Sequence, residues 1–182
     1  MINEKIIVAG FGGQGVLSIG KMIATSGMKN GLEVSFLPSY SSEMRGGTCN
    51  CNVIVSQDPV DAPVISKPNT LIVMNGPSLD KFESWAVPGA RLIINSSLVT
   101  RDPVRTDLKV YKIPFNDLAT EAGNERGMNM MVAGAYAAIS GSIPLDSIYE
   151  AIEHTFTGAK AKFVPGNKQM AKLGYDYAKT HF

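Results

Sequence analysis

A glycine-rich turn near the start of the chain has the spacing of a phosphate-binding motif. Gly10, Gly12 and Gly15 fill the glycine positions of a G-x-G-x-x-G pattern that follows the apolar run 6–9. Such glycines permit a tight turn, close approach of a ligand or partner, and close packing of helix on strand. The turn would direct amide N–H groups of a helix N-terminus outward, where they attract anions. Glycine turns also occur where backbone simply packs on backbone, so the motif alone leaves both alternatives open.

A nicotinamide dinucleotide site would need a carboxylate at the end of the next strand, to hold the ribose hydroxyls. A helix is predicted over residues 14–30, and the next strand over residues 33–37. The acid of that strand, Glu33, stands at its beginning, which a parallel sheet places at the edge away from the glycine turn. The sequence therefore argues against an independent NAD-dependent oxidoreductase.

A second candidate segment is the polar loop predicted over residues 38–48, which contains Glu43, Arg45, Gly46 and Gly47. Long loops of this kind are functional or disordered, and the apolar residues within this one favour function. Arg45 is either a bidentate ligand for phosphate or carboxylate, or the partner of Glu43 in holding the loop's shape. The paired glycines would allow close backbone approach.

Length and composition limit the classes of protein that the chain can represent. Its 182 residues suffice for one domain with a full core, so a single domain over residues 1–182 is predicted. The net charge of +1, without a Lys and Arg cluster, argues against a nucleic-acid partner. The first strand follows the N-terminus directly, and no apolar run is long enough to span a bilayer. We therefore expect a cytoplasmic protein without a membrane partner.

Metal and redox chemistry find little support in the sequence. Cys49 and Cys51 are its two cysteines, too few for a four-thiolate iron–sulfur cluster or zinc site. They lie two apart on a predicted strand and are most simply reduced core thiols. His154 and His181 have no companion ligands nearby in the sequence. No catalytic residue and no metal ligand is therefore predicted.

Strands alternate with helices along the rest of the chain. Strands are predicted over residues 49–56, 71–74, 91–95 and 109–113, the first of them nearer the sheet edge, and Ser78 is expected to cap a helix over residues 79–85. This order predicts an α/β fold, a single-domain Rossmann-like and mostly parallel sheet with helices on both faces. The glycine turn and the loop 38–48 would then emerge at the same carboxyl edge, where ligands bind.

The segment 128–140 has almost no polar face, unlike the amphipathic stripes predicted on the other helices. A helix that is apolar all round must be buried. Burial by another subunit and burial as a central core helix both fit the pattern.

Three segments together resemble a known family. They are Gly10–Gly15 with the letters G-F-G-G-Q-G, the E-M-R-G-G of residues 43–47, and the N-M-M of residues 129–131 that opens the apolar helix. In this order and spacing they resemble the gamma subunit of 2-oxoacid:ferredoxin oxidoreductases, most closely that of the separate-subunit 2-oxoglutarate enzymes. The resemblance covers essentially the whole chain. A pyruvate- or branched-chain-specific homologue, and a purely scaffolding subunit, are the alternatives.

The resemblance implies a multisubunit enzyme that oxidatively decarboxylates a 2-oxoacid, forms an acyl-CoA and passes electrons to ferredoxin. Thiamine diphosphate and iron–sulfur clusters are expected on alpha, beta and, where present, delta subunits. This chain is expected to hold no cofactor alone, to be inactive alone, and to help enclose coenzyme A. Whether the isolated chain forms a homodimer is left open.

The resemblance also gives the candidate cofactor-binding residues. They are Gly12, Gly13, Gln14 and Gly15 in the turn, together with Glu43, Arg45, Gly46 and Gly47 in the loop. The N–H groups of the turn would meet a coenzyme A phosphate or a backbone segment of a partner subunit. Gln14 offers both a hydrogen-bond donor and an acceptor beside the turn.

Overall fold

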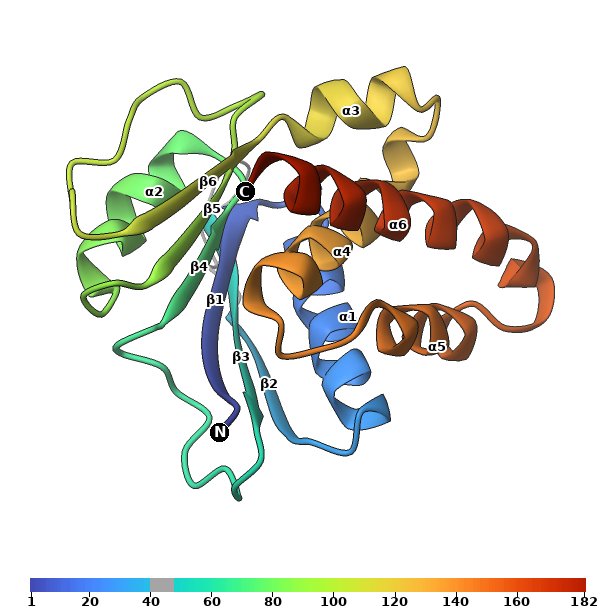
Figure 1. Ribbon diagram of the computed structural model, residues 1–182, viewed down its shortest axis with the longest axis horizontal. Helices are drawn as coiled ribbons and strands as arrows, with labels where there is room; N and C mark the ends of the chain where they lie inside the picture. The colour runs from blue at the N-terminus through green and yellow to red at the C-terminus, as the bar shows by residue number, and fades with distance from the viewer. Residues whose placement is uncertain (40–47) are drawn as a thin grey trace.

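A six-stranded sheet runs through the middle of the molecule, with its strands in the order β2-β3-β1-β4-β5-β6 (Figure 1). The computed structural model describes residues 1–39 and 48–182. The strands are β1 (Asn3–Phe11), β2 (Glu33–Ser39), β3 (Thr48–Ser56), β4 (Thr70–Val73), β5 (Arg91–Asn95) and β6 (Lys109–Ile113). The helices are α1 (Val16–Lys29), α2 (Gly76–Phe82), α3 (Phe115–Glu121), α4 (Met128–Ser140), α5 (Leu145–Thr155) and α6 (Val164–His181), with short 3-10 turns η1 (Glu83–Trp85), η2 (Glu125–Gly127) and η3 (Gly158–Phe163).

Strand direction confirms the mostly parallel α/β fold. Strands β1, β4, β5 and β6 are parallel neighbours, whereas β3 runs antiparallel between β1 and β2. The strand expected nearer the edge therefore lies one place in from it, because β2 covers its outer side. Glu33 pairs with Ser56, which also pairs with Asn3 at the start of β1. The acid lies at the edge opposite the glycine turn, as predicted.

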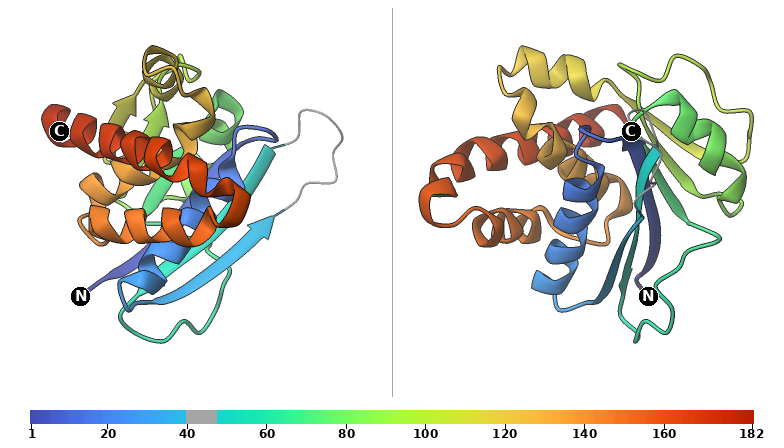
Figure 2. Two further views of the ribbon diagram at one scale, coloured as in Figure 1. Left: turned by 90° about the vertical axis from the view of Figure 1, so that its right-hand side faces the viewer. Right: turned by 180° about the vertical axis from the view of Figure 1, so that it is seen from behind.

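The two faces of the sheet are covered unequally. Helices α1, α4, α5 and α6 form a thick layer on one face, while α2 lies on the other (Figures 1 and 2). Side chains of β1 alternate between the two cores, with Ile6 and Val8 in the larger core and Ile7 in the smaller one. This alternation follows from the period of two along a strand. The crossover helices after β1 and β4 thus lie on opposite faces, so the topological switch falls between these two strands.

Helix α1 approaches the sheet closely at two glycines. A Cβ at Gly20 would lie 2.3 Å from Cys51 Sγ, and one at Gly27 would lie 2.9 Å from Val34 and Val55. No larger side chain fits at either position without movement of the helix or its neighbours. The N-terminus of α1 is thereby held close to the sheet.

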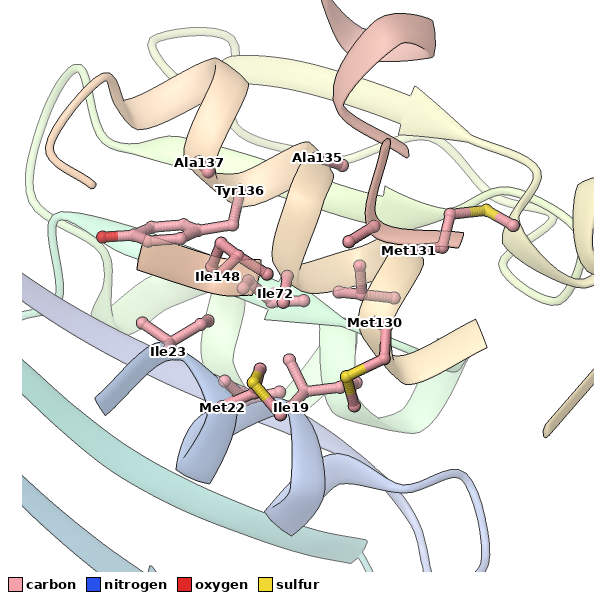
Figure 3. Packing of buried hydrophobic residues seen from close by; sticks show 14 of the residues in the cluster. Ile19, Met22, Ile23, Ile72, Met130, Met131, Ala135, Tyr136, Ala137 and Ile148 are labelled. Carbon is pink, nitrogen blue, oxygen red and sulfur yellow. The ribbon is translucent and has the colours of Figure 1, made fainter. Parts of the chain in front are cut away.

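Helix α4 is a central core helix within this chain, which was one of the two alternatives. Met131, Val132, Ala133 and Ala135 are fully buried, and Met130 points toward α1 (Figure 3). Tyr136 is buried as well, and its hydroxyl lies 3.1 Å from Ser142 Oγ. Burial of the apolar helix therefore needs no second subunit.

The cap of α2 differs from the prediction. Asn75, not Ser78, is the N-cap, and its side chain accepts a hydrogen bond from the amide N–H of Ser78. The helix starts earlier than expected because Pro77 suits its first turn. In the described part of the chain, no helix is long and apolar enough to cross a bilayer.

Candidate functional site

The glycine turn is open on its outer side. The amide N–H of Gln14 donates to the carbonyl oxygen of Phe11 (3.2 Å), which closes a turn around Gly12 and Gly13. Gly13 has a φ of 92°, a value that favours glycine at the third position of a type II turn. Both glycines are exposed, and a Cβ at either would have no described atom within 4 Å. A ligand or partner backbone can therefore approach the turn directly.

Gln14 faces inward rather than toward a ligand. Its Oε1 accepts hydrogen bonds from the amide N–H of Phe11 (2.6 Å) and from Asn75 Nδ2 (3.1 Å). Its Nε2 donates to the carbonyl oxygen of Met74 (3.2 Å). Both the donor and the acceptor of the Gln14 side chain thus form hydrogen bonds to other residues of the chain. These bonds link the end of β1 to the segment that follows β4.

Gly15 lies between the turn and α1, and it is close in space to the start of the apolar helix α4. It has a φ of 72°, and a Cβ there would lie 2.2 Å from the side-chain amide of Asn129. Helix α1 begins at the next residue, Val16, and has no side-chain N-cap hydrogen bond. Within the part of the chain that the structure describes, its first N–H groups are therefore available to an anion. Gly15 and Asn129 come together here although they are far apart in sequence.

A pocket of about 560 Å³ lies beside this junction, on the helical side of the sheet. It is bordered by the starts of α1, α4 and α6 together with the end of α5 and η3. Its lining residues are Ser18, Lys21, Met22, Asn124, Arg126, Asn129, Met130, Thr155, Phe156, Lys162, Phe163, Gly166 and Asn167. Sequence reasoning missed this site, apart from Asn129 and Met130, because its lining comes from five separate segments without a common spacing.

The pocket is electropositive. Lys21, Arg126 and Lys162 contribute three cations, and the described residues of the lining include no carboxylate. None of the three cations forms an ion pair within residues 1–39 and 48–182. The N-terminal turns of three helices add partial positive charge, while the C-terminal end of α5 adds partial negative charge. Apolar side chains such as Met22 and Phe156 line the same space, so the pocket suits an anionic ligand with a flat or apolar part.

The second candidate loop can be placed only by its ends. Glu43, Arg45, Gly46 and Gly47 lie outside the described residues. The flanking residue Thr48 pairs with Phe11, at the first residue of the glycine turn. The described end of this segment therefore lies at the carboxyl edge of β1, as the topology predicted.

The surroundings of the cysteines and histidines do not indicate a reactive or metal-binding role. Burial raises the pKa of the Cys51 thiol to about 12, and burial also raises the pKa of Cys49. Such thiols stay protonated and unreactive near neutral pH. His154 is exposed, and the ring of His181 stacks on Tyr177. Among the described residues, no group of three His, Cys, Asp or Glu side chains could hold a metal ion.

The fold and this edge define a Rossmann-like α/β domain with an open glycine turn beside a cationic pocket. The chain belongs to the Pyruvate ferredoxin/flavodoxin oxidoreductase family, which it matches over residues 5–177. The resemblance drawn from the three motifs is thereby confirmed.

Individual relatives agree with this membership. The ketoisovalerate oxidoreductase subunit VorA of Methanothermobacter thermautotrophicus is 33% identical over 179 residues, covering 97% of this chain. The chain spans only 37% of that relative's length. The 2-oxoglutarate synthase subunit KorC of Methanocaldococcus jannaschii is 28% identical over 154 residues, with 83% of this chain and 82% of KorC covered.

Solved structures share the fold. The gamma subunit of a keto/oxoacid ferredoxin oxidoreductase from Geobacter sulfurreducens PCA has a TM-score of 0.83 at 23% identity, covering 97% of this chain and 99% of that one. A 2-oxoglutarate:ferredoxin oxidoreductase from Magnetococcus marinus, solved with 2-oxoglutarate, coenzyme A and succinyl-CoA bound, has a TM-score of 0.82 at 22% identity. Here 97% of this chain and 32% of the other are covered. The fold class is confirmed by both.

Proposed function

We propose that this chain acts as the gamma subunit of a 2-oxoacid:ferredoxin oxidoreductase and that its glycine turn and cationic pocket contact coenzyme A. The observation that carries the proposal is the pocket beside the open turn, whose lining, within residues 1–39 and 48–182, has three cations and no carboxylate. Coenzyme A carries several phosphate charges and an adenine ring, and these match the cations and the apolar lining. Its thiol receives the acyl group in the overall reaction.

The remaining chemistry is assigned to other chains. We expect thiamine diphosphate and the iron–sulfur clusters on alpha, beta or delta subunits, with ferredoxin as the electron acceptor. We propose 2-oxoglutarate as substrate and succinyl-CoA as product, because the three sequence motifs resemble those enzymes most. The relatives named for ketoisovalerate, 2-oxoglutarate and pyruvate leave branched-chain and pyruvate specificity as alternatives.

Lys21 offers a direct test of the pocket. Lys21→Gln in the assembled enzyme should raise the KM for coenzyme A about tenfold, with kcat unchanged, because the lost contact binds ground state and transition state equally. Lys29→Gln is the matched control, since Lys29 is exposed at the other end of the same helix. Equal KM values for the two variants would refute the pocket assignment.

Arg45 tests the second candidate loop. If it binds a phosphate, Arg45→Lys should raise the KM for coenzyme A roughly tenfold, because lysine cannot reproduce bidentate binding. An unchanged KM with weaker subunit association would instead support the pairing of Arg45 with Glu43 as a shape-holding contact.

A scaffolding subunit is the second candidate function. It is favoured by the exposed Gly12 and Gly13, which could receive a partner's backbone as well as a phosphate. Calorimetry with coenzyme A on the isolated chain and on the complex separates the two functions. A scaffold would show no affinity in either sample, and sedimentation of the isolated chain would reveal a homodimer if one forms.

A further inference from the structure

A buried side-chain amide, that of Asn75, links the glycine turn to the segment between β4 and α2. Asn75 lies two residues beyond the end of β4 and is 3% exposed. Its Nδ2 donates to Gln14 Oε1 (3.1 Å), and its Oδ1 accepts from the amide N–H of Ser78 (2.9 Å). The side chain therefore caps α2 with one end and holds Gln14 with the other.

Gln14 in turn fixes the start of the turn. The same Oε1 accepts from the amide N–H of Phe11 at 2.6 Å. Gly10 leaves the space for this arrangement, since a Cβ there would lie 2.7 Å from Gln14 Oε1. Gly12 and Gly13 have no described neighbour near their Cβ positions. In the described part of the chain, the side chain that hydrogen-bonds to the turn is thus that of Gln14, on the side of the turn that faces the fold.

We propose that Asn75 is a positioning residue for the glycine turn and acts through Gln14. It holds the conformation in which the main chain of Gly12 and Gly13 faces outward. Its consequence for coenzyme A rests on the proposed function, whereas its effect on the turn does not.

Asn75→Asp separates the two tasks of this side chain. Aspartate is as good an N-cap as asparagine, so the hydrogen bond from the Ser78 amide N–H is retained. The donor to Gln14 is replaced by a carboxylate oxygen, which faces the Gln14 Oε1 acceptor and repels it. The variant therefore removes the bridge to the turn and keeps the cap of α2.

Asn69 provides a matched control at the other end of β4. Its Oδ1 accepts from the amide N–H of Lys5 (2.9 Å), and its Nδ2 donates to the carbonyl oxygen of Asn3 (2.8 Å). Asn69→Asp makes the same chemical change in a bridge between the same two strands. This bridge lies at the edge of the sheet opposite the turn.

Hydrogen exchange of the Phe11 amide in the full chain is the first measurement. Loss of one neutral hydrogen bond predicts about fivefold faster exchange in Asn75→Asp, with no change in Asn69→Asp. In a Gln14→Ala background, Asn75→Asp should have no further effect, because the two residues act in series. Unchanged Phe11 exchange, or a full effect without Gln14, would overturn the proposal.

The KM for coenzyme A in the assembled enzyme is the second measurement. Asn75→Asp should raise it about fivefold with kcat within about twofold, and Asn69→Asp should leave both constants unchanged. Faster Phe11 exchange with an unchanged KM would support the positioning role and overturn the coenzyme A contact instead. The two proposals therefore fail in distinguishable ways.

Discussion

The crossing of α4 and α6 has no room for a methyl group, and this predicts a large effect of a small change. A Cβ at Gly134 would lie 1.9 Å from the carbonyl oxygen of Ala171, and one at Gly174 would lie 2.0 Å from that of Met131. Real Cβ atoms essentially never show contacts under 3.0 Å. Because the obstructing atoms belong to backbone, the two helices must separate by roughly 1 Å in Gly134→Ala.

Two opposing effects determine how Gly134→Ala changes the free energy of unfolding. Overpacking a core costs about 1–3 kcal/mol, and a backbone obstruction places this variant at the upper end. Replacing glycine by alanine within a helix returns up to about 1 kcal/mol of intrinsic propensity. Gly134→Ala should therefore lower the free energy of unfolding by about 2 kcal/mol.

Urea unfolding followed by circular dichroism measures this loss. Gly166→Ala in α6 is the control, since the described atom nearest its Cβ would be Asn124 Nδ2 at an ordinary 3.5 Å. That variant should be as stable as the unchanged chain, or more stable by up to about 1 kcal/mol. If Gly134→Ala proved as stable as Gly166→Ala, the helix crossing described here would be wrong.

Three further predictions concern the turn, the buried thiol and the half-buried ion pair between Arg91 and Glu4. Gly13→Ala should cost about 1 kcal/mol more than Gly12→Ala in urea unfolding, because both sites are open and only Gly13 has positive φ. Stability should fall between pH 9 and 12, as the unfolded chain ionises Cys51 while the folded chain holds its raised pKa of about 12; urea titrations at several pH values should show a smaller fall for Cys51→Ala. Glu4→Gln should cost about 1 kcal/mol in thermal or urea unfolding, since Arg91, 27% exposed, loses its 2.9 Å carboxylate partner while an amide oxygen can still accept its hydrogen bond.

The fold could be predicted from sequence to the extent that it depends on local pattern. Alternating apolar runs and helical stripes gave the elements, and the place of Glu33 gave the edge on which it lies. The antiparallel direction of β3 was not predicted, because a period of two is the same in either direction, and only the short helix-free connection from β2 indicates it. The apolar pattern of α4 likewise did not distinguish a partner subunit from the chain's own α1 and α6.

The candidate site was predictable only in its backbone part. The glycines of the turn follow from spacing. Gly10 is needed for a close contact and Gly13 and Gly15 for a positive φ, whereas Gly12 shows neither requirement among the described residues. One of the inward hydrogen bonds of Gln14 comes from Asn75, which was not expected to be the cap of α2, because Ser78 was predicted in that role. The cations Lys21, Arg126 and Lys162 have no shared period, so only the folded chain brings them together.

The inward hydrogen bonds of Gln14 limit which groups of the turn can contact a ligand. Because the side chain of Gln14 is bonded within the fold, the proposed recognition at the turn would rely on backbone N–H groups and the neighbouring cations. Backbone donors attract any anion, whereas the cations add attraction that salt screens when they are exposed. Lys21 and Arg126 are exposed, so affinity for a phosphate ligand should weaken as salt increases. A partner's neutral backbone docked on Gly12 and Gly13 would show no such dependence.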